Sequence, residues 1–457
     1  MPRRETLFEL GPAIPIERPI RTERAPGALI ARPVRNQVEM PVSTLDDRVA
    51  SDHPVRAIVD IVEGLNLGRF EASVRSNETG GGRPAVAPSV LLALWVYATS
   101  QGESRASEIA RRIETDDVYR WICGGIPVSE RVLADFRARS GHLLQDVLSQ
   151  VIASLMNEGL IDLHRVAQDG TRVRTWAGAD SYRRKETLET LLSDAAAHVQ
   201  RVMSEGHDQN RSKVAQAAAM RAAKDRADRI ARALELVKTK MEGVSDADPS
   251  DKKRAPRAST TDAEATRMKM ADGGFRPAYN IQFATTADGT GAIVGVSVTN
   301  RGNDFGEIAP MVSAVKERTG VQPREWLVDG GYTKKTDIED VEVSGTSVFG
   351  PERKDRAASD GRTARERSAA LIAYNARIES PEGKAIYAQR GEVAELANAH
   401  AKSRFGLSLL RLRGLAGATI LALLAAVTND VLVLVRERAA VMRTHAASTN
   451  PAPIAGA

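Results

Sequence analysis

The feature that most constrains the fold is a change of hydrophobic period at residues 163–175. Side chains around Asp169 alternate as in a β-strand, whereas the residues before and after this run have the three- and four-residue spacing of helices. The next β-rich runs are Tyr279–Thr286 and Ala292–Thr299, separated by the hairpin signal Ala-Asp-Gly-Thr-Gly. The sequence therefore predicts an α/β fold in which a helical insertion at about 178–268 divides the first strand from its sheet.

The elements after the hairpin complete a mixed sheet with helices packed on it. Glu307–Thr319 has helical spacing, Glu325–Val328 is an apolar strand that ends at Asp329, and Thr346–Phe349 is a short strand. The carboxyl ends of neighbouring strands lie close together in such a sheet. We therefore expect Asp169 and Asp329, taken as strand-end residues, to meet.

The residues before the first strand predict an all-α region. Ser89–Thr99 is nearly all apolar and indicates a buried helix, and Ser104–Thr115 and Ser129–Ser140 each begin with a serine that can cap a helix. A Gly-Gly-Ile-Pro turn separates the last two, as in a helix-turn-helix. A helical bundle that only packs fits the same pattern.

Composition limits the cellular environment and the kind of binding partner that fit this protein. Lys and Arg outnumber Asp and Glu by 64 to 59, and a pI near 9.3 with clustered basic residues favours a polyanionic partner. The single cysteine, Cys123, rules out an intramolecular disulfide and predicts a small buried core residue. The apolar run Leu415–Val427 is broken by Asn429 and Asp430, so we expect no membrane insertion and a cytoplasmic protein.

Three acidic residues carry the candidate chemistry. Asp169 lies in Val-Ala-Gln-Asp-Gly-Thr and Asp329 in Trp-Leu-Val-Asp-Gly-Gly-Tyr, where a following glycine lets the backbone turn away. Glu395, Asn398 and Lys402 share one face of a polar helix. Two strand-end aspartates and a helical glutamate can hold two Mg²⁺ ions, although ordinary Asp-Gly turns and a charged surface helix have the same residues.

Five motifs in order resemble bacterial insertion-sequence transposases of the DDE class over roughly residues 40–440. They are Gln-Asp-Gly-Thr, Arg-Pro-Ala-Tyr-Asn-Ile-Gln at 276–282, Val-Asp-Gly-Gly-Tyr, Tyr-x-x-Arg with Glu-x-x-Asn-x-x-x-Lys, and Leu-Arg-Gly-Leu at 412–415. The resemblance implies a ribonuclease-H-like mixed sheet with a helical insertion, preceded by an all-α N-terminal DNA-binding domain. It also implies that Asp169, Asp329 and Glu395 form the catalytic triad.

The same resemblance assigns cofactors and DNA contacts. The triad would hold two Mg²⁺ ions, for which Mn²⁺ can substitute. Four residues separate Arg390 from Glu395, where the family commonly has three, and Glu392 is a competing carboxylate. Glu395 is preferred because its spacing to Lys402 is the usual one. The expected DNA-binding residues are Tyr387, Arg390, Lys402, Arg172, Arg174 and Lys269.

The implied protein is a transposase that binds terminal inverted repeats and joins the cut ends to target DNA. Its partner is double-stranded DNA, its synaptic complex is expected to be a homodimer, and its location would be the bacterial cytoplasm, at the nucleoid. A catalytically silent DNA-binding protein derived from a transposase is the alternative. We divide the chain into a flexible basic arm (1–37), a helical DNA-binding domain (38–160), a catalytic domain (161–440) and a disordered tail (441–457).

Two further features have both a structural and a functional interpretation. Trp176 follows the first strand and is expected to be a core residue, with base stacking as the alternative. The basic run Lys252–Arg254, with Arg257, is either a solvated linker or a contact to the DNA backbone. His400 lies on the glutamate helix and could approach the site.

Overall fold

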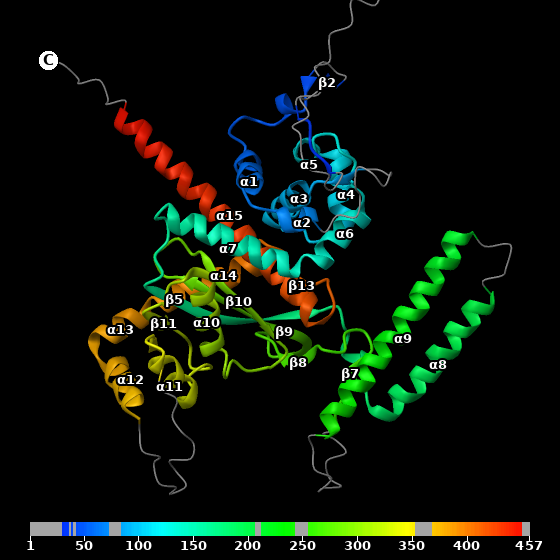
Figure 1. The fold of residues 1–457 in the computed structure, drawn as a ribbon. Coiled ribbons are helices and arrows are strands. Elements are labelled where there is room, and N and C mark those ends of the chain that lie inside the picture. Colours follow the sequence, from blue (N-terminus) through cyan, green and yellow to red (C-terminus); the bar gives the residue numbers. More distant parts are fainter. Residues whose placement is uncertain are drawn as a thin grey trace, which may run out of the picture.

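A computed structural model describes residues 30–35, 38–39, 43–72, 84–205, 212–242, 255–351 and 368–449. A seven-stranded mixed sheet forms its centre, with the order β10-β9-β5-β11-β12 (Figure 1). The strand β9 is antiparallel to β5 and β10, whereas β11 and β12 are parallel to β5. This order and these directions make the fold ribonuclease-H-like. The strands are β5 (Arg165–Thr175), β8 (Thr266–Lys269), β9 (Phe275–Thr286), β10 (Ile293–Thr299), β11 (Glu325–Leu327), β12 (Ser347–Phe349) and β13 (Leu409–Leu410).

The central strand β5 confirms the strand predicted at residues 163–175, but Asp169 lies in its middle. On one side β5 pairs with β9 over its length. On the other side β11 pairs only with Arg165–Ala167, and β13 pairs only with Arg174 and Thr175. The prediction that Asp169 ends a strand is therefore wrong. Asp169 instead faces the open stretch of edge between two short neighbours.

Helices cover both faces of this sheet. Adjacent residues of a strand point to opposite faces. Helix α10 (Ile308–Thr319) packs on the face that carries Ala284, whose cross-strand neighbour is Gln168. Helix α14 (Arg390–Ser403) packs on the other face, where Ala394 lies in one apolar cluster with Ala167. The chain reaches α14 through α11 (Lys335–Val343), α12 (Ala369–Glu379) and α13 (Pro381–Ala388).

The N-terminal helices share their hydrophobic core with the sheet. Helix α7 (Gly141–Asn157) and the long helix α15 (Gly414–Thr449) lie between the bundle and the sheet, and one continuous apolar cluster spans both (Figure 1). Helix α3 (Pro88–Ser100) is buried nearly all round, as predicted for Ser89–Thr99. The smaller N-terminal elements are β1 (Ile30–Ala31), β2 (Val38–Glu39), β3 (Ser43–Thr44), η1 (Asp46–Arg48), α1 (Pro54–Glu63), α2 (Gly68–Ala72) and β4 (Ala85–Val86).

Helix α15 is a core helix, and it extends beyond its predicted end. It has the length and hydropathy of a membrane span, but 83% of its most apolar window is buried inside the fold, so it serves as a core helix. It also continues to Thr449, which makes the prediction of a disordered tail from residue 441 wrong for residues 441–449. Residues 450–457, and residues 1–29 of the predicted basic arm, lie outside the described residues.

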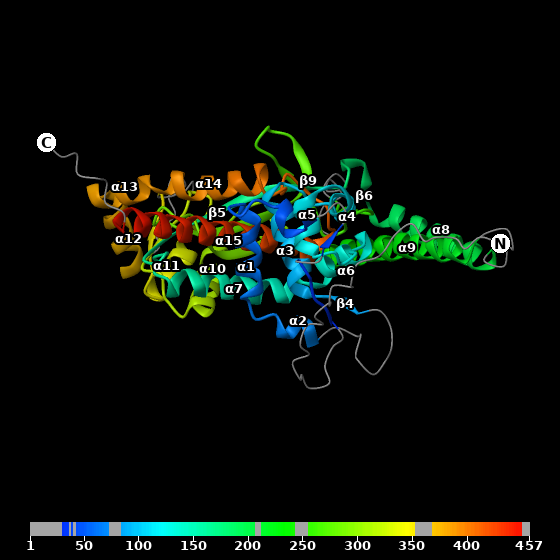
Figure 2. The same cartoon turned by 90° about the horizontal axis from the view of Figure 1, so that it is seen from above.

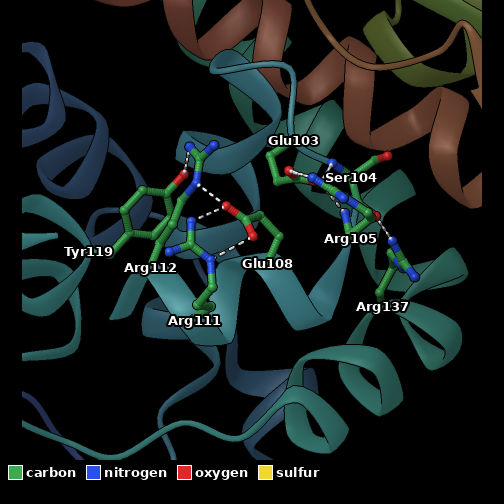
Figure 3. A network of polar contacts seen from close by, with 8 residues as sticks. All are labelled: Glu103, Ser104, Arg105, Glu108, Arg111, Arg112, Tyr119 and Arg137. Atoms are coloured by element: carbon green, nitrogen blue, oxygen red, sulfur yellow. Dashed lines mark hydrogen bonds and ion pairs between the residues drawn. The ribbon is translucent and has the colours of Figure 1, made fainter. Parts of the chain in front are cut away.

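The expected helix-turn-helix is interrupted by an additional helix. Helix α5 (Asp117–Cys123) lies between α4 (Ala106–Thr115) and α6 (Glu130–Arg139), so the Gly-Gly-Ile-Pro turn joins α5 to α6. Ser129 caps α6 as predicted, accepting the Val132 N–H at 3.4 Å. Ser104 does not cap α4. The buried Glu103 instead accepts the amides of Ser104 and Arg105, and Figure 3 shows this network beside the arginines that converge on Glu108.

Two long helices project from the sheet as a separate arm (Figures 1 and 2). Helices α8 (Lys185–Glu205) and α9 (Lys213–Glu242) pack against each other through a small apolar core of their own. The short strands β6 (Tyr182–Arg183) and β7 (Ala258–Ser259), after the single turn η2 (Ala179–Ser181), pair at its base. The basic run Lys252–Arg254 lies outside the described residues.

Glycine at position 295 sets the distance between α10 and the sheet. A Cβ there would lie 2.6 Å from Met311 Sδ and 2.9 Å from Ala284 Cβ. Overpacking of this kind costs about 1–3 kcal/mol, so Gly295→Ala should lower the free energy of unfolding by that amount in urea denaturation. Gly178 has φ −75° and no atom within 4 Å of its Cβ position, so Gly178→Ala is the control and should raise the free energy of unfolding by about 0.4–1 kcal/mol. Equal stability of both variants would contradict the packing described here.

Candidate active site

Asp169 is held on the sheet by hydrogen bonds to both carboxylate oxygens. The Gly170 N–H donates to Oδ1 at 2.9 Å, and the Asn398 Nδ2 donates to Oδ2 at 3.0 Å. Asn398 belongs to α14, which crosses the sheet at this point. Helix α14 thus fixes the side chain of Asp169 although 229 positions separate the two residues.

Asp329 faces Asp169 across the open edge of β5. It lies two residues beyond the end of β11, where its Oδ1 accepts the Gly331 N–H at 2.7 Å. The pKa of Asp169 is raised to about 6, mainly by burial and then by the charge of Asp329, while the Arg390 guanidinium acts in the opposite direction. A carboxylate whose charge acts on a partly buried neighbour in this way lies close to it. The structure brings these two predicted residues together.

Glu395 lies on the same helix as Asn398 but points outward. Its side chain is 70% exposed, and its Oε1 lies 3.9 Å from Arg390 Nη2. Within the part of the chain that the structure describes, no group of three or more His, Cys, Asp or Glu side chains is arranged to hold a metal ion. The third predicted carboxylate is therefore one helical turn from Asn398 and is paired with an arginine.

Two other candidates on α14, Glu392 and His400, face away from Asp169. Glu392 and His400 line a separate cavity of about 480 Å³ between α14, α15 and the β9–β10 turn. The expectation that His400 approaches the site is therefore wrong. The position of Glu392 favours Glu395 as the third carboxylate, because Glu395 lies on the side of the helix that carries Asn398.

A cavity of about 760 Å³, lined by more basic than acidic side chains, includes Asp329 and Gly170, the residue after Asp169, in its wall. Its sides come from β5, from the β8–β9 hairpin and from α14, so segments far apart in the sequence form one surface. The charged side chains that line it include Arg172, Arg174, Lys269, Arg276, Asp304 and Lys402.

The residues expected to bind DNA are distributed unequally around this cavity. Arg174 and Lys269 are exposed in it. Arg172 donates to the carbonyl oxygens of Lys269 and Gly302 at 2.8 and 3.0 Å, so it braces the cavity wall. Lys402 is half-buried, and burial lowers the pKa of its amine although the nearby Asp169 acts in the opposite direction.

Two residues of the expected glutamate signature lie below the surface. The helix predicted to carry Tyr387 and Glu395 is broken at Gln389, so Tyr387 belongs to α13. There it packs in the apolar cluster of Ala167. The Arg390 side chain is only 16% exposed, and its charge faces Asp169.

Two aromatic side chains project into solvent near the same end of the sheet. Trp176, directly after β5, is 59% exposed and carries the Arg411 guanidinium 5.5 Å from its ring centroid. Phe275, at the start of β9, is 58% exposed. The prediction of a core tryptophan is wrong. Among the described residues these are the only exposed aromatic side chains.

Sequence reasoning missed the polar network behind the two aspartates. Asp304, in the loop after β10, accepts the side-chain amides of Asn280 and Gln282, each at 2.6 Å. The signal was available, because Asn280 and Gln282 are polar residues on one face of an otherwise apolar strand. The explanation given for one glycine also changes, since Gly170 lies within β5 and makes no turn.

Comparison with known families agrees with this geometry. The "Transposase domain (DUF772)" family matches residues 43–139, and the "Transposase DDE domain" family matches residues 246–428. No curated protein and no solved structure gives a significant match. The sheet order and the apposed aspartates define a ribonuclease-H-like protein. With the two family matches, the chain belongs to the DDE-class transposases of insertion sequences. Asp329 and Glu395 lie inside the DDE match, and Asp169 lies before it.

The raised pKa of Asp169 predicts a pH-dependent cost to stability. The folded protein binds a proton at Asp169 that the unfolded chain, with a pKa near 3.8, releases earlier, so stability falls as pH rises from about 4 to about 6. Asp169→Asn removes this cost. In thermal and urea denaturation with EDTA, the variant should exceed the wild type by about 1–3 kcal/mol at pH 8 and match it near pH 4. A constant difference between the two proteins across this range would contradict the assignment.

Proposed function

We propose that this transposase cleaves DNA at the terminal inverted repeats of its element and transfers the ends to target DNA, with Asp169, Asp329 and Glu395 as the catalytic carboxylates. The observation that carries the proposal is the proximity of Asp169 to Asp329, which lines a cavity with several basic side chains. Phosphodiester chemistry needs a concentrated negative charge to hold cations, beside a positive surface to hold the substrate. Both are present here on adjacent elements.

The donor set fits divalent ions of the Mg²⁺ type, which prefer carboxylate oxygens. Asp169 and Asp329 would hold the ions, and their mutual repulsion would be relieved by a bound cation. Glu395 would join them by leaving its ion pair with Arg390. When bound, two Mg²⁺ or Mn²⁺ ions supply charge neutralisation and a water of lowered pKa.

The chain's own residues would orient the two aspartates and neutralise the charge of the phosphate. Asn398 and the Gly331 N–H hold the two aspartates in fixed rotamers. Arg390 and Lys402 place positive charge beside Asp169, where a phosphate would approach. Arg174 and Lys269, exposed in the cavity, would contact the DNA backbone. Tyr387 would support the N-terminal part of α14 by packing against the apolar cluster of Ala167 and Ala394.

Recognition of the terminal repeats belongs, in this proposal, to residues 38–160. The arginines of α4 are engaged within the protein, because Arg111 and Arg112 pair with Glu108 at 2.6 and 3.1 Å (Figure 3). Helix α6 follows a glycine turn and exposes Arg139, and also Arg131, which pairs with Asp135 at 3.7 Å. A helix of this kind can enter a major groove. Cleavage at both ends of an element would need two copies, so we propose a homodimer that acts at the nucleoid in the cytoplasm.

A catalytically silent DNA-binding protein is the second candidate, and carboxylate variants separate the two. In a nicking assay on element-end DNA with Mg²⁺, Asp169→Asn, Asp329→Asn and Glu395→Gln should each lower the rate by at least about 10³-fold, because the ions lose a ligand. Glu392→Gln is the matched control and should cut like the wild type. DNA affinity in Ca²⁺ should stay unchanged in all four variants. A wild type that binds but never nicks would establish the silent alternative.

The cavity cations predict a change in the salt dependence of DNA binding. Each phosphate contact contributes about −0.9 to the slope of log K against log salt. Arg174→Ala and Lys269→Ala should each reduce the magnitude of that slope by about this amount, measured by fluorescence anisotropy. Lys316 on α10 is also exposed but does not line the cavity, so Lys316→Ala should leave the slope unchanged. Identical slopes for all three variants would exclude the cavity as the DNA path.

A further inference from the structure

We propose that Asp304 is a positioning residue of the active site, which fixes Asp169 and Asp329 through a clamp of side-chain amides. This inference rests on the proposed cleavage function. It assigns a role to the motif at 276–282, to Asp304 itself and to the glycines beside both aspartates.

The clamp is built around one oxygen atom. Asp304 Oδ1 accepts hydrogen bonds from Asn280 Nδ2 and Gln282 Nε2, both at 2.6 Å. Hydrogen bonds to an ionised carboxylate are about twice as strong as neutral ones. Because Asn280 and Gln282 lie on β9, the two bonds hold the loop after β10 against the centre of the sheet.

The clamp continues into the core through Gln282. Its Oε1 accepts the Tyr332 hydroxyl and, at 3.4 Å, the Gln168 amide. Gln168 in turn accepts the Trp326 indole N–H at 3.0 Å. Every donor in this buried chain has an acceptor, and the chain ends on Asp304. Removing Asp304 would leave two amides without their acceptor in a buried setting, which is costly and lets them reorient.

The clamp touches the backbone next to both catalytic aspartates. A Cβ on Gly170 would lie 2.4 Å from Gln282 Nε2 and 2.7 Å from Asp304 Oδ1. A Cβ on Gly331 would lie 3.3 Å from Asp304 Oδ2. Gly170 and Gly331 are also the residues whose N–H groups bind the carboxylates of Asp169 and Asp329. Asp304 therefore lies beside the two glycines whose N–H groups orient the reacting carboxylates.

The buried hydroxyl of Tyr332 lies near the same three carboxylates. Burial is the main cause that raises the pKa of Tyr332, and three nearby carboxylates raise it further. These carboxylates belong to Asp304, Asp169 and Asp329. The hydroxyl that enters the clamp is thus close to all three, so displacement of the clamp would be felt at both catalytic aspartates.

The test compares Asp304→Ala with Asp304→Asn in single-turnover cleavage of element-end DNA at saturating Mg²⁺ and DNA. Loss of an outer-shell partner costs about 10–100-fold, so Asp304→Ala should lower the rate constant by that factor while the DNA dissociation constant stays unchanged. Asp304→Asn should retain most of the rate, because its amide oxygen still accepts both bonds. Glu317→Ala, an exposed carboxylate on α10, is the matched control and should leave the rate unchanged.

A double-mutant cycle completes the test. If Asp304 acts through Asn280, the combined variant Asn280→Ala with Asp304→Ala should be no slower than Asp304→Ala alone. Additive losses would overturn the inference, and so would a rate for Asp304→Ala equal to wild type or reduced only in proportion to its unfolded fraction. An Asp304→Asn variant as slow as Asp304→Ala would overturn it as well, since the charge alone would then matter. A wild type that does not cleave in Mg²⁺ overturns the proposed function and this inference together.

Discussion

The gap in the pairing of β5 is the constraint on which the site depends. Between Ala167 and Arg174 the strand has β9 on one side and no neighbouring strand on the other. An unpaired edge in the middle of a sheet leaves backbone and side chains accessible at a point that the flanking strands hold rigid. Asp169 occupies this point. Asp329 reaches it from the end of β11, and Asn398 reaches it from α14.

The shared core gives the N-terminal helices a fixed relation to this site. Helices α7 and α15 are buried between the bundle and the sheet, so the bundle has no separate hydrophobic core. Gly102 of the bundle and Gly406 after α14 pack backbone against backbone, where a Cβ on Gly406 would lie 3.1 Å from the Gly102 carbonyl oxygen. DNA held by the bundle would therefore be held at a set distance from the aspartates, a form of preorganisation that lowers the entropic cost of cleavage.

The strands, the main helices and the pair Asp169 and Asp329 could be predicted from the sequence because each depends on local periodicity and on strand order. The residues that surround the two aspartates could not be placed in this way. The break at Gln389 places Tyr387 on a different helix from Glu395, although neither a proline nor a glycine at that position announces it. Trp176 looks like a core residue by type, and only the tertiary fold exposes it. Asp304 lies in an irregular loop, where no period relates it to its partners on β9.

The charges around Asp169 account for the outward position of Glu395. The charge of Asp329 already disfavours ionisation of Asp169, and a third carboxylate beside them would add repulsion in a half-buried setting. Arg390 lies between the two groups, since its charge acts on Asp169 while its Nη2 is 3.9 Å from Glu395 Oε1. An ion pair at that distance is weak when one partner is as exposed as Glu395, so little holds Glu395 in place. Added positive charge at the aspartates would therefore favour the approach of Glu395, which is the movement that the proposed two-ion site requires.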